Sequence, residues 1–249
     1  MAAERFEFVG GAGTRLSAVV QRPAGDVRGS VLMAHCFTCS KDLHTVTRLS
    51  RAFVDAGWLT LAFDFTGLGD SAGEFASTSV STNVADLRRA ASAMLERRIG
   101  PCLLLGHSLG GSAAVLAAAS LKTVDAVIAV ASPADVAHIR HLLPNDAETA
   151  TERFEIAVGG RPFALDPTFI EDLDTHSVTD AAVSLDRPFL VVEAGDDKIV
   201  GADQTAALAA AGNGDRVVVE GADHLFTAPD HARQLADIVV KWATGNATG

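Results

Sequence analysis

The stretch LLLGHSLGGSAAV, residues 103–115, decides the fold class of this chain. Three leucines in a row are typical of a strand buried on both faces, and the small residues after Ser108 are typical of a closely packed helix. Between them lies the pattern G-x-S-x-G, in which Gly106 and Gly110 flank the serine. A sharp turn from strand to helix needs glycine at these two positions, because side chains there would collide. The stretch therefore predicts a serine raised above one strand of a parallel sheet.

The alternation of short apolar runs with longer amphipathic segments extends on both sides of this stretch. Strands that alternate with helices predict an α/β fold with a mostly parallel eight-stranded sheet flanked by helices. The predicted strands cover residues 5–9, 16–22, 30–34, 59–63, 102–106, 126–130, 189–194 and 217–219. The predicted helices cover residues 43–56, 80–97, 109–120, 203–211 and 228–242.

Residues 134–185 interrupt this rhythm after the sixth predicted strand. They are rich in Asp and Glu, contain GGRP at residues 159–162, and predict short helical pieces rather than a strand. We expect one domain over residues 1–249, with this segment as a small insertion. Ligands of such sheets bind beyond the carboxyl ends of the strands, so the insertion is expected either to cap a pocket or to pack on the surface without substrate contact.

Composition narrows the class of protein further. Of the 249 residues, 48% are hydrophobic and 20% charged, which is typical of a globular chain with a large core. The net charge of −11 argues against nucleic acid or anionic membranes as partners. The charged N-terminus and the absence of a long apolar stretch favour a cytoplasmic protein. With only three cysteines, a disulfide framework is not expected and reduced thiols are the default.

A serine hydroxyl becomes a nucleophile when a histidine takes its proton and a carboxylate orients that histidine. The expected chain order is serine, acid, histidine. Asp196 and Asp197 follow the predicted strand at residues 189–194, and His224 follows the one at residues 217–219. The D-x-x-V spacing to Val200 favours Asp197 over Asp196. We therefore predict Ser108, Asp197 and His224 as catalytic residues, with structural or surface roles for the other seven histidines.

The attacked carbonyl would also need N–H donors for its developing negative charge. Leu109 supplies one at the start of the helix after Ser108, and Phe37 is the candidate for the second. Hydrolases often have the pair His-Gly at this point of the loop, where this chain has His35 followed by Cys36. The loop is therefore expected to avoid a glycine-only conformation or to be rearranged. The predicted acyl pocket comprises Phe37, Leu109, Leu142, Phe163, Phe169 and Leu225.

Cys36 and Cys39 form a C-x-x-C pair in the same loop. This spacing is typical of redox dithiols and of half of many zinc sites. No second set of Cys or His follows at a suitable spacing, so no metal site is predicted. Two readings stay open: small buried thiols that shape the loop, or a redox pair whose oxidation deforms the oxyanion site.

The loop FDFTGLGDS, residues 63–71, is rich in glycine but lacks G-x-G-x-x-G and the lysine of a phosphate-binding loop. It predicts a tight turn beside the serine, with a structural role for Asp64.

Four motifs together carry a family resemblance: AHCFTCSKD at residues 34–42, FDFTGLG at 63–69, GHSLGG at 106–111 and GADH at 221–224. The chain resembles a subfamily of bacterial α/β hydrolases that often form the hydrolase half of fusions with an OsmC-like domain. The resemblance covers nearly the whole chain, and the C-F-T-C loop is its most specific part. It implies the same catalytic triad and an esterase-like activity. OsmC-like proteins reduce organic peroxides through cysteines, so the fusions favour a redox role for the thiols. The sequence shows no OsmC-like domain.

The predicted activity is hydrolysis of a carboxylic ester with a small or medium acyl group, through an acyl-enzyme on Ser108. A serine at this turn argues against dehalogenases and epoxide hydrolases, whose relatives have aspartate there. A thioesterase or amidase would use the same triad, and a non-catalytic module that senses redox state through the Cys36 and Cys39 pair is the alternative from another class. The expected partner is a small-molecule ester, with no cofactor, and the expected state is a monomer or homodimer.

Overall fold

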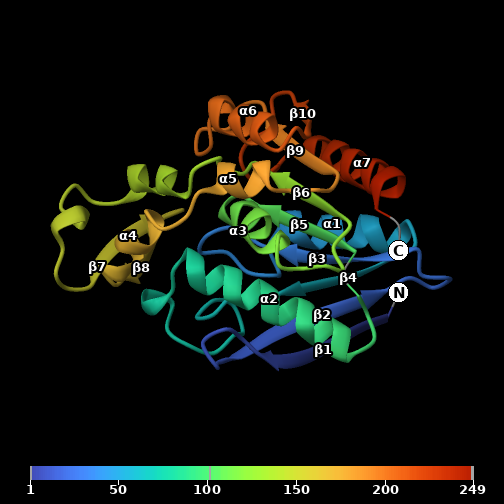
Figure 1. Ribbon diagram of the computed structural model, residues 1–249, viewed down its shortest axis with the longest axis horizontal. Helices are drawn as coiled ribbons and strands as arrows, with labels where there is room; N and C mark the ends of the chain where they lie inside the picture. The colour runs from blue at the N-terminus through green and yellow to red at the C-terminus, as the bar shows by residue number, and fades with distance from the viewer. Residues whose placement is uncertain (1, 101, 248–249) are drawn as a thin grey trace.

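The computed structural model describes residues 2–100 and 102–247 and is built on an eight-stranded sheet (Figure 1). In spatial order the sheet runs β1-β2-β4-β3-β5-β6-β9-β10. β2 pairs antiparallel with β1 and β4, and all the other neighbours are parallel. The mostly parallel eight-stranded sheet predicted from the sequence is therefore confirmed. Its strands are β1 (Ala2–Val9), β2 (Arg15–Arg22), β3 (Gly29–Ala34), β4 (Trp58–Phe63), β5 (Leu103–His107), β6 (Ala126–Val130), β9 (Phe189–Ala194) and β10 (Asp215–Val219).

Helices cover both faces of the sheet, and the sheet separates two hydrophobic cores, one on each face. α1 (His44–Asp55) and α7 (Pro229–Asn246) pack on one face, with the buried side chains of Phe53 and Leu235. α2 (Val80–Glu96), α3 (Leu109–Ala118) and α6 (Ala202–Ala211) pack on the other. Every residue of β3, β4, β5, β6 and β9 is buried, which explains their continuous apolar runs. All five predicted helices are present, and α7 ends at Asn246 rather than at 242.

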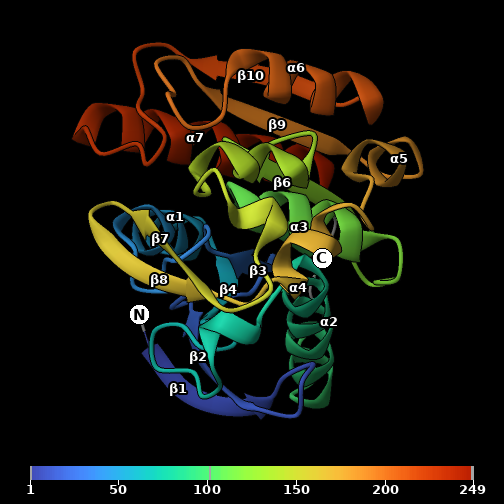
Figure 2. The same ribbon diagram turned by 90° about the vertical axis from the view of Figure 1, so that its left-hand side faces the viewer.

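The segment between β6 and β9 projects beyond one end of the sheet in Figure 1, and its hairpin lies in front in Figure 2, where that end faces the viewer. It contains the predicted short helices, but it also contains a β-hairpin, so the expectation that it lacks strands is wrong. Gly159 and Gly160 form the two-residue turn of this hairpin, both with positive φ, and Pro162 is tolerated because the sheet has only two strands. The elements of this segment, with η for a 3₁₀ helix, are η2 (Val136–Leu142), η3 (Ala147–Thr149), β7 (Phe154–Val158), β8 (Arg161–Leu165), α4 (Thr168–Leu173) and α5 (Val178–Val183). A further 3₁₀ helix, η1 (Phe75–Ser77), lies outside the segment and precedes α2.

Within the described residues, no helix combines the length and the apolar character needed to cross a membrane. Nor do three or more His, Cys, Asp or Glu side chains of these residues gather in an arrangement that would hold a metal ion.

Candidate active site

Ser108 occupies the turn between β5 and α3 with φ of 55° and ψ of −129°. This backbone conformation is unfavourable for a residue with a Cβ atom and persists only where the surroundings impose it. The Ser108 amide donates to the Val130 carbonyl at 2.8 Å, which ties the turn to β6. The Ser108 side chain makes no hydrogen bond to another described residue, and it lines a cavity at the carboxyl end of the sheet.

The glycines around Ser108 are required by close backbone packing. A Cβ atom on Gly106 would overlap the Gly110 carbonyl, and one on Gly110 would overlap the carbonyl of His35. Both neighbours are main chain, which cannot rotate away as a side chain can. The G-x-S-x-G pattern thus has a direct steric cause in this fold.

Asp197 and His224 meet across the ends of β9 and β10. The Nδ1 atom of His224 lies 2.7 Å from Asp197 Oδ2. The other carboxylate oxygen, Oδ1, accepts the N–H groups of Ile199 at 2.8 Å and Val200 at 2.9 Å. These two bonds give the D-x-x-V spacing a structural basis, since they fix the carboxylate toward His224. Asp196 also lies at the cavity, but it is exposed, and its side chain bonds to none of the residues described.

The pKa of Asp197 is below its usual value despite its burial. Burial alone would raise the pKa, but the hydrogen bond and charge of His224 outweigh it, together with the N–H groups of Val200 and Ile199. The carboxylate is therefore ionised at neutral pH and accepts a hydrogen bond from the Nδ1–H group of His224. That bond leaves Nε2 as the ring nitrogen available to a hydroxyl.

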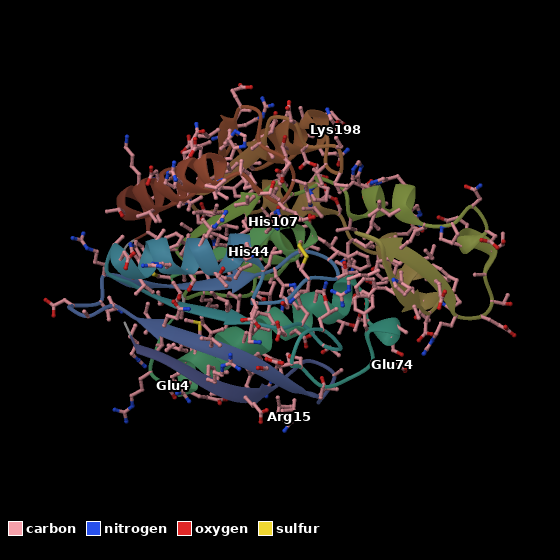
Figure 3. All side chains as sticks on the ribbon, turned by 180° about the vertical axis from the view of Figure 1, so that it is seen from behind. Glu4, Arg15, His44, Glu74, His107 and Lys198 are labelled. Carbon is pink, nitrogen blue, oxygen red and sulfur yellow. A yellow bond between two sulfur atoms is a disulfide. The ribbon has the colours of Figure 1, made fainter. Side chains whose placement is uncertain are left out.

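His107, the residue before Ser108, lies in the interior of the molecule (Figure 3). The Nε2 atom of His107 donates to the backbone carbonyl of His224 at 2.8 Å. This bond holds the loop that carries His224. Nδ1 has no partner among the described residues. Burial, reinforced by the proximity of His224, lowers the pKa of His107 to about 3. His107 is therefore neutral and positions His224 through its backbone.

The depressed pKa of His107 predicts a loss of stability in mild acid. Unfolded, this histidine takes up a proton near pH 6.5, whereas folded it stays neutral until about pH 3. Its contribution is fully present above pH 6.5 and is lost as the pH falls, by about 1.4 kcal/mol per pH unit at most. Urea unfolding between pH 7 and pH 5 should show a steeper decline for the wild type than for His107→Gln, which keeps an N–H donor but does not titrate. Equal slopes would contradict the assignment.

Phe37 and Leu109 both line the cavity, and their N–H groups have no hydrogen-bond partner among the described residues. The Cys36 carbonyl, on the same peptide unit as the Phe37 N–H, lies 2.8 Å from His35 Nδ1. His35 Nε2 accepts the Phe65 N–H at 3.2 Å, so Nδ1 carries the hydrogen and donates. Because the peptide is trans, the Phe37 N–H points away from this carbonyl. His35 thus orients the peptide that carries the candidate donor.

Cys36 and Cys39 are joined by a disulfide, drawn in yellow in Figure 3, with their Cα atoms 5.4 Å apart. The expectation of reduced thiols is wrong for this pair, because the chain turns back at Phe37 and Thr38 and brings the two sulfurs together. The third cysteine, Cys102, is buried and free, and burial raises the pKa of its thiol.

An ion network that the sequence did not indicate anchors the end of the same loop. Lys41 is buried, and its Nζ donates to Asp64 at 2.8 Å and to Asp70 at 2.7 Å. Asp64 also accepts the Lys41 backbone N–H at 2.6 Å, which supports the structural role predicted for this aspartate. Burial alone would lower the pKa of Lys41, but these carboxylates raise it above its usual value. The network joins the loop after β3 to the turn after β4.

The cavity has a volume of about 510 Å³ and is mostly apolar. Of the predicted pocket residues, Phe37, Leu109, Leu142, Phe163 and Leu225 line it. Phe169 does not: it is buried, and its ring packs behind Phe37 with the centroids 5.6 Å apart. The segment between β6 and β9 forms part of the wall, through Val136, Ile139, Leu142, Ala157, Val158, Arg161 and Phe163.

Ser108 and His224 open onto this same cavity, but no hydrogen bond joins them among the described residues. Such bonds are often long in the free form of an enzyme and tighten with substrate. A hydroxyl, an imidazole with a carboxylate partner and two unpaired N–H groups at one cavity can together activate a nucleophile and stabilise an oxyanion.

A parallel sheet with an antiparallel edge and a serine on the turn after its fifth strand define the α/β hydrolase fold. Residues 31–238 match the model of the alpha/beta hydrolase family, and the chain belongs to this family. It is 35% identical to the esterase domain of a Rhodothermus marinus protein, with a TM-score of 0.82 and 99% of each chain covered.

More distant structures share the fold. Est1E from Butyrivibrio proteoclasticus is 19% identical, with a TM-score of 0.83 over 97% of this chain and 98% of that one. The esterase Pf2001 from Pyrococcus furiosus is 16% identical, with a TM-score of 0.76 over 98% and 93%. No curated protein sequence matches the chain. Neither the family description nor the names of these structures mention an OsmC-like domain.

Proposed function

We propose that this protein is a serine esterase that cleaves carboxylic esters through an acyl-enzyme on Ser108. One observation carries the proposal: Ser108, held at a strained turn, opens onto the same apolar cavity as His224, whose Nδ1 is bonded to the ionised Asp197. The esterase domain from Rhodothermus marinus, similar over nearly the whole chain, supports it.

In the proposed reaction, His224 Nε2 removes the Ser108 proton as Oγ attacks the ester carbonyl. The N–H groups of Phe37 and Leu109 bind the oxyanion, and His224 then protonates the leaving alcohol. Water, deprotonated by the same histidine, attacks the acyl-enzyme and releases the acid. Asp197 stays ionised throughout and stabilises the imidazolium.

The cavity favours an uncharged acyl group of small or medium length. Its lining is mostly apolar, with Leu109, Leu142 and Leu225 among its residues, and its volume lies in the lower part of the range for small-molecule sites. We further propose that residues 134–185 act as a cap, because they form part of the cavity wall.

A panel of p-nitrophenyl esters tests this function. We expect kcat/KM to rise from the acetate by up to about fourfold for each buried methylene, since burying a CH₂ group is worth about 0.8 kcal/mol, until the cavity is filled. A fluorophosphonate should stop the hydrolysis by modifying Ser108, which peptide mapping identifies. Thioesters and anilides with the same acyl groups serve as controls for the leaving group. Absence of ester hydrolysis, or modification at another residue, would refute the proposal.

A further inference from the structure

The disulfide between Cys36 and Cys39 encloses the peptide that carries the Phe37 N–H. The Cys39 amide donates to the Cys36 carbonyl at 3.2 Å, so residues 36–39 form a β-turn with the disulfide across its ends. Phe37 and Thr38 are the two central residues. The turn and the cavity share all four residues, which line the wall beside Ser108.

Thr38 has a φ of 60°, at the third position of this turn. Phe37 is not among the residues with positive φ, so the turn has the pattern of type II. Glycine or asparagine is favoured at its third position, and a β-branched residue such as threonine is strongly disfavoured there. An unfavourable conformation persists only where other bonds impose it, and the disulfide spans this residue directly.

The chain on both sides of the turn is anchored independently of the disulfide. His35 is bonded to the Phe65 amide, and Lys41 is bonded to the buried Asp64. Loss of the disulfide would therefore free the turn while leaving the rest of the loop in place.

The two cysteines differ in exposure. Cys36 is buried, with 4% of its surface exposed, whereas Cys39 is partly exposed and also lines the cavity. We therefore expect a small thiol to attack Cys39, the more exposed of the two.

We infer that the Cys36–Cys39 disulfide is a redox modification site that sets the oxyanion-binding turn, with the oxidised form the more active one. This inference rests on the proposed function. The thiolate of a small thiol attacks Cys39 Sγ, the disulfide breaks, and Cys36 leaves as a thiolate. A second thiolate attacks the external sulfur of the mixed disulfide and releases Cys39, so that two small thiols give one small disulfide and two protein thiols. The freed turn relaxes at Thr38, and the Phe37 N–H, whose peptide is then held by the His35 bond to the Cys36 carbonyl without the disulfide, is less firmly oriented.

Reduction by dithiothreitol, followed by removal of the reductant under argon, tests this. Removal of one oxyanion donor costs about 10²- to 10³-fold in kcat, so a donor that is loosened rather than removed should cost about tenfold. KM should change much less, because the oxyanion forms only in the transition state. Reoxidation with oxidised glutathione should restore kcat. An unchanged kcat in protein whose two thiols are shown free by mass spectrometry would overturn the inference.

Three variants make the test specific. Cys36→Ser/Cys39→Ser should match the reduced wild type and not respond to either reagent, whereas Cys102→Ala should keep the full response. Thr38→Asn should show a smaller difference between the oxidised and reduced forms, because asparagine tolerates positive φ better than threonine. If reduction lowers kcat equally in Thr38→Asn and in the wild type, the inferred relaxation of the turn at Thr38 is wrong.

Hydrogen exchange separates this inference from the proposed function. The Cys39 amide, which donates to the Cys36 carbonyl across the turn, should exchange faster after reduction, with the exchange of the Lys41 amide and of β5 and β6 unchanged. If Ser108 proves inert to the fluorophosphonate, the esterase proposal fails, but faster exchange would still support the disulfide as the clamp of this turn. Unchanged exchange would overturn it.

Discussion

Replacing Ser108 with alanine is expected to lower kcat for a p-nitrophenyl ester by about 10⁴- to 10⁶-fold, on the scale of nucleophile removals in serine hydrolases. Thr38 also lines the cavity, but its hydroxyl already donates to the Phe37 carbonyl at 2.7 Å and has no histidine partner among the described residues. The change should cost less than about 1 kcal/mol of stability, because the Ser108 side chain makes no hydrogen bond that would be lost.

Kinetics and labelling together decide this prediction. Ser108→Ala should not react with a fluorophosphonate, whereas Ser120→Ala, a change outside the cavity, should react like the wild type. A Ser108→Ala enzyme that folds normally and keeps more than about one hundredth of the wild-type kcat would exclude an acyl-enzyme on Ser108.

The features that sequence analysis predicted well depend on short patterns with a steric or topological cause. Gly106 and Gly110 stand where any Cβ atom would strike main chain, so the strand-to-helix turn could be read from five residues. Asp197 and His224 could be placed near each other because each follows a strand of one parallel sheet. Their catalytic roles stay predictions, but the contact between them follows from topology.

The features that it missed depend on contacts between distant parts of the chain or on the conformation of one turn. Lys41 is buried because Asp64 and Asp70 meet it from 23 and 29 residues away, and no local pattern signals this. The pKa of His107 falls because the chain folds over it, 117 residues from its partner His224. A C-x-x-C pair is compatible with a dithiol, half of a metal site or a disulfide. The turn at Thr38, which brings the two cysteines together, cannot be read from this spacing.

The hairpin of β7 and β8 was missed for another reason. Pro162 argues against a strand in a larger sheet, because proline cannot donate a ladder hydrogen bond. In a sheet of two strands both strands are edge strands, where proline is tolerated. The pair Gly159-Gly160 was the available signal, since two glycines between short apolar runs are typical of a two-residue hairpin turn.

Replacing Asp197 with asparagine is expected to lower kcat by about 10⁴-fold, the scale found when the acid of a triad is made neutral. The Asn Oδ1 can keep the bonds from Ile199 and Val200, which leaves the NH₂ group facing His224 Nδ1. Nδ1 must then accept, the ring hydrogen moves to Nε2, and His224 can no longer take the serine proton. The fold should survive, as circular dichroism and urea unfolding would show.

Asp196→Asn is the matched control, because it changes the neighbouring carboxylate, which has no side-chain partner among the described residues and also lies at the cavity. It removes the same charge from nearly the same place, so it measures the effect of charge without the effect on the tautomer of His224. This variant should keep most of the wild-type kcat. If the two variants lose activity equally, the negative charge of the loop supports catalysis, and the specific bond between Asp197 and His224 does not. If Asp196→Asn loses more, Asp196 is the acid, and the D-x-x-V spacing serves only the turn.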